Sequence, residues 1–191
     1  MRIIAGAAGG RRLAVPAGDQ TRPTSDRARE GLFGTVQGIC GPLDGASVLD
    51  LYAGSGAVGL EALSRGAARA LLVEADPRAV RVIRANIAAL GLAGAELAAS
   101  RVERVLARGP GAGRFALAFA DPPYAAAGGE IAAVLTALID QRWLIQGALV
   151  AVERSTRSGP VPWPAGYAPD RSRRYGEATL WYGLATSALL A

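Results

Sequence analysis

The segment Val48-Leu49-Asp50-Leu51-Tyr52-Ala53-Gly54-Ser55-Gly56-Ala57-Val58-Gly59 places a glycine-rich bend directly after an apolar run. Glycines let a backbone approach a ligand where side chains would collide, and a bend between a strand and a helix is typical of nucleotide-binding α/β folds. Glu74 ends the next apolar run, where a carboxylate can accept hydrogen bonds from both hydroxyls of a ribose. The pattern predicts a cofactor that carries a nucleoside.

Apolar strands and amphipathic helices alternate along the chain outward from this bend. We expect strands at residues 47–52, 70–74, 95–99, 115–120 and 148–153, with helices at 57–64, 77–90, 102–108 and 130–139. Because parallel neighbours need crossover helices, the alternation predicts an α/β fold with a doubly wound, mostly parallel sheet. A closing antiparallel hairpin is expected at 171–175 and 179–184, a loop at 155–169, and fraying at 185–191.

The region before the sheet has its own pattern. Two short strands, at residues 2–5 and 11–15, flank a turn-prone stretch and predict a small N-terminal β-hairpin with Arg11 and Arg12 near its tip. Pro23 and a hydroxyl cap, Thr24 or Ser25, announce a helix that should end near residue 41. With 191 residues, near the upper limit for one domain, we expect a basic hairpin extension at residues 1–22 and one catalytic domain at 23–191.

Composition excludes several chemistries. All 21 cationic residues are arginines, and the absence of lysine and histidine rules out a lysine Schiff base, a phosphate-loop lysine, a Ser-His-Asp triad and histidine-ligated zinc. The single cysteine, Cys40, can form neither an internal disulfide nor a thiolate metal cluster, which fits a reducing compartment. No apolar run approaches the ~18 to 20 residues of a membrane span. We therefore expect an unprocessed, monomeric, cytoplasmic protein without metal or membrane contact.

The net charge of +5 is concentrated at the two flanks of the chain. Residues 1–30 carry six arginines against three acids, and residues 154–174 carry five against one, whereas the stretch between them is almost neutral. One interpretation is a phosphate-contacting surface on both sides of a catalytic module; the other is that arginines on solvated faces only keep the protein soluble.

The glycine bend does not by itself identify the nucleoside cofactor. Gly54, Gly56 and Gly59 satisfy the dinucleotide pattern G-x-G-x-x-G, so a nicotinamide dehydrogenase stays an alternative. Asp50 favours S-adenosylmethionine, because it precedes the first glycine at a position suited to a cationic amino-acid head group. The absence of lysine also removes the Tyr-x-x-x-Lys chemistry of many small dehydrogenases.

The strand expected at residues 115–120 ends in Asp121-Pro122-Pro123-Tyr124. Ligands of open α/β sheets bind beyond the carboxyl ends of the strands, so this tetrapeptide should face the same crevice as the glycine bend. The Asp121 carboxylate and the Pro122 carbonyl could accept the hydrogens of an exocyclic amine and aim its lone pair at an electrophile. Pro123 stiffens the corner, and Tyr124 could stack on an extruded base. A plain Asp-capped Pro-Pro turn is the structural alternative.

Together these residues resemble a class I S-adenosylmethionine-dependent methyltransferase of the Asp-Pro-Pro-Tyr type. The segments at residues 2–6, 22–33 and 50–62 are similar to the family of bacterial 16S ribosomal RNA guanine-N2 methyltransferases, over roughly residues 1–153. The resemblance implies a seven-stranded Rossmann-like sheet, S-adenosylmethionine as the donor, and 16S rRNA in a small ribosomal subunit or its assembly intermediate as the partner. It also implies that the N-terminal hairpin and the segment from Arg22 to Thr24 face RNA.

One position departs from the family pattern. Where such enzymes often carry Asp or Asn near the adenine, this chain has Arg101, which cannot accept from the adenine amine, so we expect backbone groups of Arg101 and Val102 to hold the ring. The remaining cofactor contacts are expected at Asp50, Tyr52, Ala53, Gly54, Ser55, Gly56 and Glu74, and RNA contacts at Arg11, Arg12, Arg22, Thr24, Arg27, Arg173 and Arg174.

The hypothesis is transfer of a methyl group from S-adenosylmethionine to N2 of a guanine in 16S rRNA. N6-adenine methylation of DNA or RNA is the alternative within the same chemistry, because the tetrapeptide fits any planar exocyclic amine. A dehydrogenase and a cofactor-free RNA-binding module are the alternatives outside it.

Overall fold

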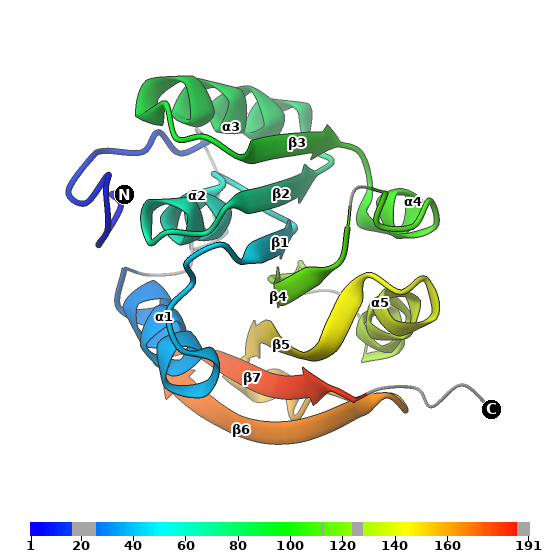
Figure 1. The fold of residues 1–191 in the computed structure, drawn as a ribbon. Coiled ribbons are helices and arrows are strands. Elements are labelled where there is room, and N and C mark those ends of the chain that lie inside the picture. The colour runs from blue at the N-terminus through cyan, green and yellow to red at the C-terminus, as the bar shows by residue number, and fades with distance from the viewer. Residues whose placement is uncertain (17–25, 112, 124–127, 187–191) are drawn as a thin grey trace.

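The computed structural model of the protein describes residues 1–16, 26–111, 113–123 and 128–186. Its centre is a seven-stranded sheet (Figure 1). The strands are β1 (Ser47–Leu51), β2 (Arg69–Glu74), β3 (Ala95–Ala99), β4 (Phe115–Ala120), β5 (Leu144–Ser155), β6 (Tyr167–Tyr175) and β7 (Ala178–Ala185).

The strands follow the order β3-β2-β1-β4-β5-β7-β6. The first five run parallel to one another, and β7 is antiparallel to both β5 and β6, between which it lies. The order reverses between β1 and β4, so ligands are expected where the carboxyl ends of these two strands separate. The predicted doubly wound, mostly parallel sheet of seven strands is confirmed.

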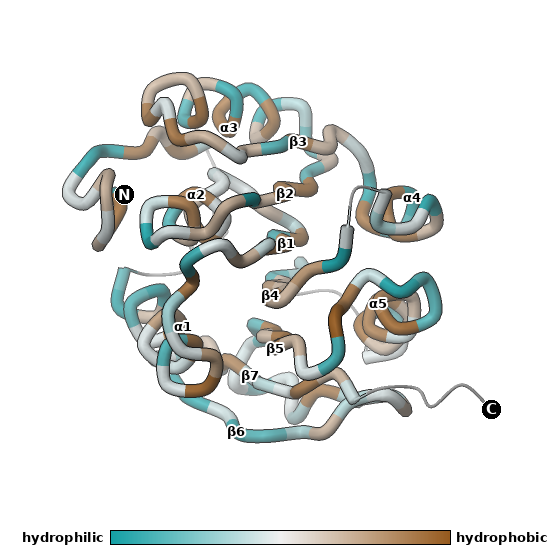
Figure 2. Tube along the Cα trace, in the orientation of Figure 1, coloured by the Kyte–Doolittle hydropathy of each residue, from teal (hydrophilic) through white to brown (hydrophobic). Residues whose placement is uncertain are grey.

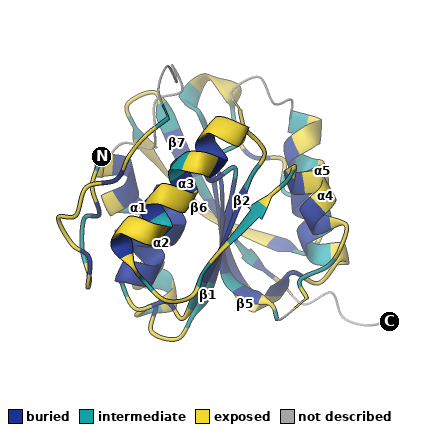
Figure 3. Ribbon diagram, turned by 90° about the horizontal axis from the view of Figure 1, so that it is seen from above, coloured by how far each residue is buried: buried dark blue, intermediate teal, exposed yellow. Residues whose placement is uncertain are grey.

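Helices cover both faces of the sheet (Figures 1 and 3). α1 (Asp26–Cys40), α2 (Ala57–Ser64) and α3 (Pro77–Leu90) bury apolar side chains in one core cluster, and α4 (Val102–Leu106) and α5 (Gly128–Asp140) bury theirs in a second cluster on the other face. A short 3-10 helix, η1 (Thr156–Ser158), follows β5. In Figure 3 the strands are mostly buried, while the outer sides of the helices are exposed. Burial of these two faces is the main force that holds the three layers together.

The N-terminal segment, residues 1–16, differs from the predicted hairpin. It turns back on itself, and residues 1–3 bond to residues 10–13 through three backbone hydrogen bonds, but this pairing amounts to one isolated antiparallel bridge between Arg2 and Arg12 and does not extend to two strands. The amides of Ile4 and Ala5 explain the difference, because they donate to the Glu61 carboxylate at 2.7 and 3.0 Å and are therefore not available to a partner strand. The segment is also part of the main core, to which it contributes Ile3, Ala8 and Leu13.

Glu61 is the centre of a buried polar cluster beneath this segment. Its carboxylate is fully buried, accepts from Arg65 Nε at 2.8 Å, and lies 3.7 Å from Arg29 Nε, whose side chain is fully buried in α1. Arg29 also donates to the carbonyl of Arg2. One buried carboxylate therefore joins the N-terminal segment, α1 and α2, and a charge buried in this way needs all of these partners.

Other differences from the predicted elements are small. β6 begins at Tyr167, inside the expected loop, because the bulge between Pro169 and Arg171 lets a proline stand in this edge strand. Figure 2 shows β6 as largely hydrophilic, as expected for an edge facing water. The predicted hydroxyl cap of α1 and the residues from 187 onward lie outside the described residues. Within the described ranges, no helix has the length and apolarity needed to cross a membrane.

Candidate active site

The glycine bend forms a tight turn between β1 and α2. Tyr52, Gly54 and Gly56 all have left-handed backbone angles, with φ of 60°, 57° and 78°. A Cβ at Gly56 would lie 2.7 Å from Leu72 Cδ2, so the fold itself requires glycine there. At Gly54, by contrast, a Cβ would meet no atom of the described residues within 4 Å, so among these residues this side of the turn is open. The open side is where a ligand can approach the backbone. We call residues 53–56 the cofactor turn.

Glu74 is brought to this turn from the end of β2. Its Oε2 accepts from Gly54 N at 2.8 Å, and its Oε1 accepts from Ala75 N at 2.7 Å and Asp76 N at 2.8 Å. The predicted proximity of the glycine bend and the acid is therefore present. Oε1 thus accepts two hydrogen bonds and Oε2 accepts one, so Oε2 keeps a lone pair with which the group can accept from a ribose hydroxyl while it holds the turn.

Asp50 lies beneath the turn rather than at its open side. It is 1% exposed, and its Oδ2 accepts from Gly59 N in the first turn of α2 at 2.8 Å. Burial raises the pKa of Asp50 to about 7; the negative charge of Glu74 adds to this rise, and the hydrogen bond from Gly59 opposes it. A positive charge placed near the turn would favour the ionised form of Asp50.

Tyr52 is half-buried at the start of the turn. Burial raises the pKa of its phenol to about 12, and the negative charges of Glu103 and Glu130 contribute. Its hydroxyl therefore stays protonated at neutral pH and can act as a hydrogen-bond donor.

Asp121 directly follows β4, beside the end of β1. Its N–H points to Leu51 O at 3.5 Å, so the Asp-Pro-Pro corner and the cofactor turn begin from neighbouring strands at the same edge of the sheet. Burial raises the pKa of Asp121 well above its usual value, and the charges of Glu153 and Asp50 raise it further. Tyr124, the predicted stacking residue, lies outside the described residues.

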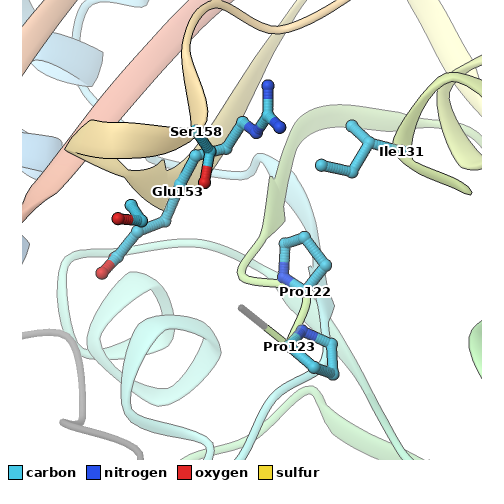
Figure 4. Close-up of a pocket in the computed structure, with 7 residues that line it drawn as sticks. Pro122, Pro123, Ile131, Glu153 and Ser158 are labelled. Atoms are coloured by element: carbon cyan, nitrogen blue, oxygen red, sulfur yellow. The ribbon is translucent and has the colours of Figure 1, made fainter. Parts of the chain in front are cut away.

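Pro122 and Pro123 line a shallow surface hollow at the carboxyl ends of β4 and β5. Figure 4 shows the two prolines between Ile131 on one side and Glu153 and Ser158 on the other. The rigid corner therefore stands at an accessible surface, as the approach of a substrate requires.

Glu153 was not among the predicted site residues. The last registered pair of β4 and β5 is Ala120 with Val152, so Asp121 and Glu153 follow at matching positions on adjacent strands, and Glu153 is 3% exposed. The signal that singled out Glu74, an acid closing an apolar strand, was also present at Glu153. Three carboxylates thus belong to neighbouring strands of the sheet: Asp50 lies on β1, Asp121 directly after β4, and Glu153 on β5.

The predicted adenine contacts lie after β3, on the same edge. Arg101 caps the N-terminus of α4 with an extended backbone, and its side chain is exposed, with Nε 3.5 Å from Glu103 Oε2. Val102 is buried in the core. The side chain of Arg101 lies beside a neighbouring acid and in solvent, and the adenine contact expected at the backbone of these two residues stays a prediction.

The predicted RNA-contacting arginines fall in different places. Arg173 and Arg174 are exposed at the end of β6. The last residue of β6, Tyr175, and the last residue of β5, Ser155, both pair with Ala178 of β7, so β6 ends at the same edge of the sheet as β5. This is the edge at which Asp121 follows β4. Arg27 is exposed on the first turn of α1. Arg22 and Thr24 lie outside the described residues.

Arg11 and Arg12 lie near the opposite edge of the sheet. The Arg11 guanidinium donates to Leu90 O at 2.8 Å and also to Ala89 O, at the C-terminal end of α3 just before β3 begins. Such contacts satisfy helix-end carbonyls and suit the negative end of the helix dipole, so Arg11 has a structural role. Arg12 is exposed.

The sheet order and these sites define a class of protein. A glycine turn after β1, an acid after β2, an Asp-Pro-Pro corner after β4 and an antiparallel β7 inserted next to β5 are the features of a class I S-adenosylmethionine-dependent methyltransferase. The dinucleotide fold of dehydrogenases instead continues its order as 3-2-1-4-5-6. The residues fit the cofactor, since the open side of Gly54 and the Glu74 carboxylate stand together.

Comparisons with known proteins give the family. Residues 1–183 match the family model described as "Conserved hypothetical protein 95", and the chain belongs to this family. It is 36% identical over 177 residues, 93% of this chain and 86% of the relative, to ribosomal RNA small subunit methyltransferase D of Escherichia coli. It is 33% identical to the protein of the same name from Haemophilus influenzae, over 80% of this chain and 78% of the relative.

Solved structures agree with the assignment. The methyltransferase yhhF from Escherichia coli has a TM-score of 0.84 and 35% identity over 97% of this chain and 98% of its own. An RNA methyltransferase from Salinibacter ruber, solved with S-adenosyl-L-homocysteine, shares the fold with a TM-score of 0.63 at 18% identity over 88% and 97% of the two chains. The chain is an S-adenosylmethionine-dependent methyltransferase, and the dehydrogenase and the cofactor-free RNA-binding module are excluded.

Proposed function

We propose that this protein transfers a methyl group from S-adenosylmethionine to N2 of a guanine in 16S rRNA, within the small ribosomal subunit or its assembly intermediate. The observation that carries the proposal is the Asp121-Pro122 corner, which begins beside the strand that leads into the cofactor turn. An amine-activating corner next to a methyl donor is the arrangement that N-methylation of a base requires. The name of the 36% identical relative from Escherichia coli supports ribosomal RNA of the small subunit as the substrate.

The chain's residues divide the work between the two reactants. Asp121 and the Pro122 carbonyl accept the two hydrogens of the guanine amine, which turns its lone pair away from the ring and toward the methyl donor. When bound, the cofactor supplies an electrophilic methyl group on a positively charged sulfur. The amine gains a bond to carbon as the carbon–sulfur bond breaks, and its extra proton then leaves to water or to the Asp121 carboxylate. Tyr124 stacks on the base.

The cofactor contacts complete the proposal. Glu74 accepts from the ribose hydroxyls, and Tyr52, Ala53, Gly54, Ser55 and Gly56 surround the methionine end. Asp50, from below the turn, supplies negative charge toward the cationic end. Backbone groups of Arg101 and Val102 hold the adenine.

For the RNA, we propose that the exposed arginines at the end of β6 and at the start of α1 contact phosphates near the target base. The RNA contacts expected at Arg22 and Thr24 stay predictions. Arg12, which is exposed near the opposite edge of the sheet, is proposed as a separate phosphate contact, together with the part of Arg11 that its bonds to the end of α3 leave free. Residues 1–22 then act as an RNA-facing extension of a catalytic domain at residues 23–191. We propose that the protein acts as a monomer in the cytoplasm, without a metal.

The test is nucleoside analysis after reaction. Small subunits from a bacterial strain that lacks its own enzyme of this family are incubated with the protein and S-adenosylmethionine labelled in the methyl group. Labelled N2-methylguanosine at one position of 16S rRNA is the expected product. Labelled N6-methyladenosine would establish the alternative within the same chemistry, and an absence of label in the rRNA would refute an rRNA substrate.

A further inference from the structure

Asn86, on α3, is a buried polar residue that the sequence did not single out. It is 3% exposed, and its Nδ2 donates to Ser55 O at 2.9 Å and to Ala14 O at 3.0 Å. Its Oδ1 accepts from Ala14 N at 2.9 Å. A single side-chain amide therefore joins the cofactor turn to the N-terminal segment.

A second contact links the same two parts of the chain. Ser55 Oγ donates to Met1 Sδ at 3.4 Å, and Leu13 N donates to Met1 O at 3.1 Å. Both ends of the folded-back N-terminal segment, at Met1 and at Ala14, thus meet the cofactor turn through Ser55 or through Asn86. The tip of the segment lies farther away, against the C-terminal ends of α2 and α3.

Asn86 holds the turn from its buried side. Ile83, one helical turn earlier on α3, faces Gly56, whose Cβ position is 3.4 Å from Ile83 Cγ1. Gly54, on the other side, has no atom of residues 1–16, 26–111, 113–123 or 128–186 within 4 Å of its Cβ position. The hydrogen bond from Asn86 therefore fixes Ser55 O without occupying the space of a ligand.

We propose that Asn86 is a positioning residue that holds the cofactor turn in its binding shape and couples cofactor binding to the N-terminal segment's contact with RNA. Asn86 is hydrogen-bonded to both the cofactor turn and the N-terminal segment. A ligand that orders one of them also orders Asn86, and this lowers the entropy cost of ordering the other. Such coupling is reciprocal, so RNA strengthens cofactor binding by the factor by which the cofactor strengthens RNA binding. The RNA half of this proposal rests on the proposed function; the cofactor half does not.

Asn86→Asp tests the cofactor half. This nearly isosteric change replaces the Nδ2 donor by an acceptor, so that Ser55 O and Ala14 O lose their donor while Ala14 N keeps an acceptor. The matched control is Ser64→Ala, which removes the Ser64 Oγ bonds to Ala8 N (2.9 Å) and Ala5 O (2.6 Å) and loosens the same segment away from the turn.

Calorimetric titration with S-adenosylhomocysteine gives the affinities of both variants. We expect Asn86→Asp to bind about tenfold more weakly and to raise KM for S-adenosylmethionine with kcat within about twofold, while Ser64→Ala binds like the original chain. Unchanged affinity in a folded Asn86→Asp protein would overturn the proposal. So would an equal loss in both variants, because it would reduce Asn86 to a general stabilising contact.

The coupling is measured by repeating the titrations with saturating small subunits. We expect the subunits to raise cofactor affinity in the original chain and in Ser64→Ala but not in Asn86→Asp; an equal gain in all three would overturn the coupling. If small subunits do not bind the original chain at all, the proposed function fails, while the titrations without subunits still decide the cofactor half.

Hydrogen exchange in the unsubstituted protein gives a measurement that does not depend on the folding of a variant. S-adenosylhomocysteine should slow exchange of the Ala14 amide, which Asn86 holds, and leave the Ala8 amide, which Ser64 holds, unchanged. The same change at both amides, or none at Ala14, would overturn the proposal.

Discussion

Replacing Gly54 by alanine should separate cofactor binding from stability. Gly54 has φ of 57°, and a Cβ there would lie more than 4 Å from every atom in the part of the chain that the structure describes. The cost to the folded protein is therefore the left-handed backbone of one alanine, about 1 kcal/mol, which corresponds to about 2 to 4 °C in Tm for a chain of this length. The new methyl group projects into the open side of the turn. If the cofactor occupies that space, its affinity should fall at least about tenfold, or ~1.4 kcal/mol.

Gly91→Ala is the matched control for this substitution. Gly91, at the C-cap of α3, has φ of 64° and equally open surroundings, but it is not part of the turn. Both variants should lose similar stability in thermal unfolding, and only Gly54→Ala should lose affinity for S-adenosylhomocysteine in calorimetric titration. If Gly54→Ala binds as tightly as Gly91→Ala, the cofactor does not lie against this turn and the reasoning is refuted.

Three further predictions concern the acids and the arginines. Asp121→Ala should lower turnover on small subunits about 10²-fold or more while titration shows cofactor affinity nearly intact, since a positioned acceptor is lost at the reacting amine; undiminished turnover would falsify its role. Because burial raises the pKa of Asp50 to about 7, above its unfolded value, its contribution to stability is complete below about pH 4 and is lost as pH rises to about 7. Asp50→Asn keeps an acceptor for Gly59 N but cannot ionise, so it should flatten this decline in the free energy of unfolding, which amounts to up to a few kcal/mol. Urea unfolding at several pH values measures the decline. An unchanged dependence of the unfolding free energy on pH would contradict the raised pKa of Asp50. Replacing Arg173 and Arg174 together by alanine should weaken RNA binding and make it less salt-dependent, and an unchanged salt slope would mean that these arginines serve solubility alone.

The parts of the fold that the sequence predicted are those set by local pattern. The strands at residues 95–99 and 115–120 and the helices at 57–64 and 77–90 have the predicted bounds, because hydrophobic periodicity and glycine punctuation act within each element. The approach of Glu74 to the cofactor turn was also predictable, since parallel strands bring their carboxyl ends to one edge of the sheet.

The parts that the sequence did not predict depend on contacts between distant residues. Alternation predicted a strand at residues 2–5, but Glu61 takes the amides of Ile4 and Ala5, and no local pattern announces an acceptor 57 residues away. Asn86 looked like an ordinary helix position for the same reason. Glu153 carried a local signal, but its importance comes from its place opposite Asp121, which depends on the register of two strands.

The Glu61 carboxylate also has a consequence for how the chain matures during its synthesis. Residues 4 and 5 leave the ribosome well before residue 61, so their amides remain bound to water until the second helix of the sheet domain has emerged and folded. Residues 4 and 5 are thus synthesised before Glu61 but reach their final place only after α2 has formed, and a contact between such distant residues adds to the time that folding needs.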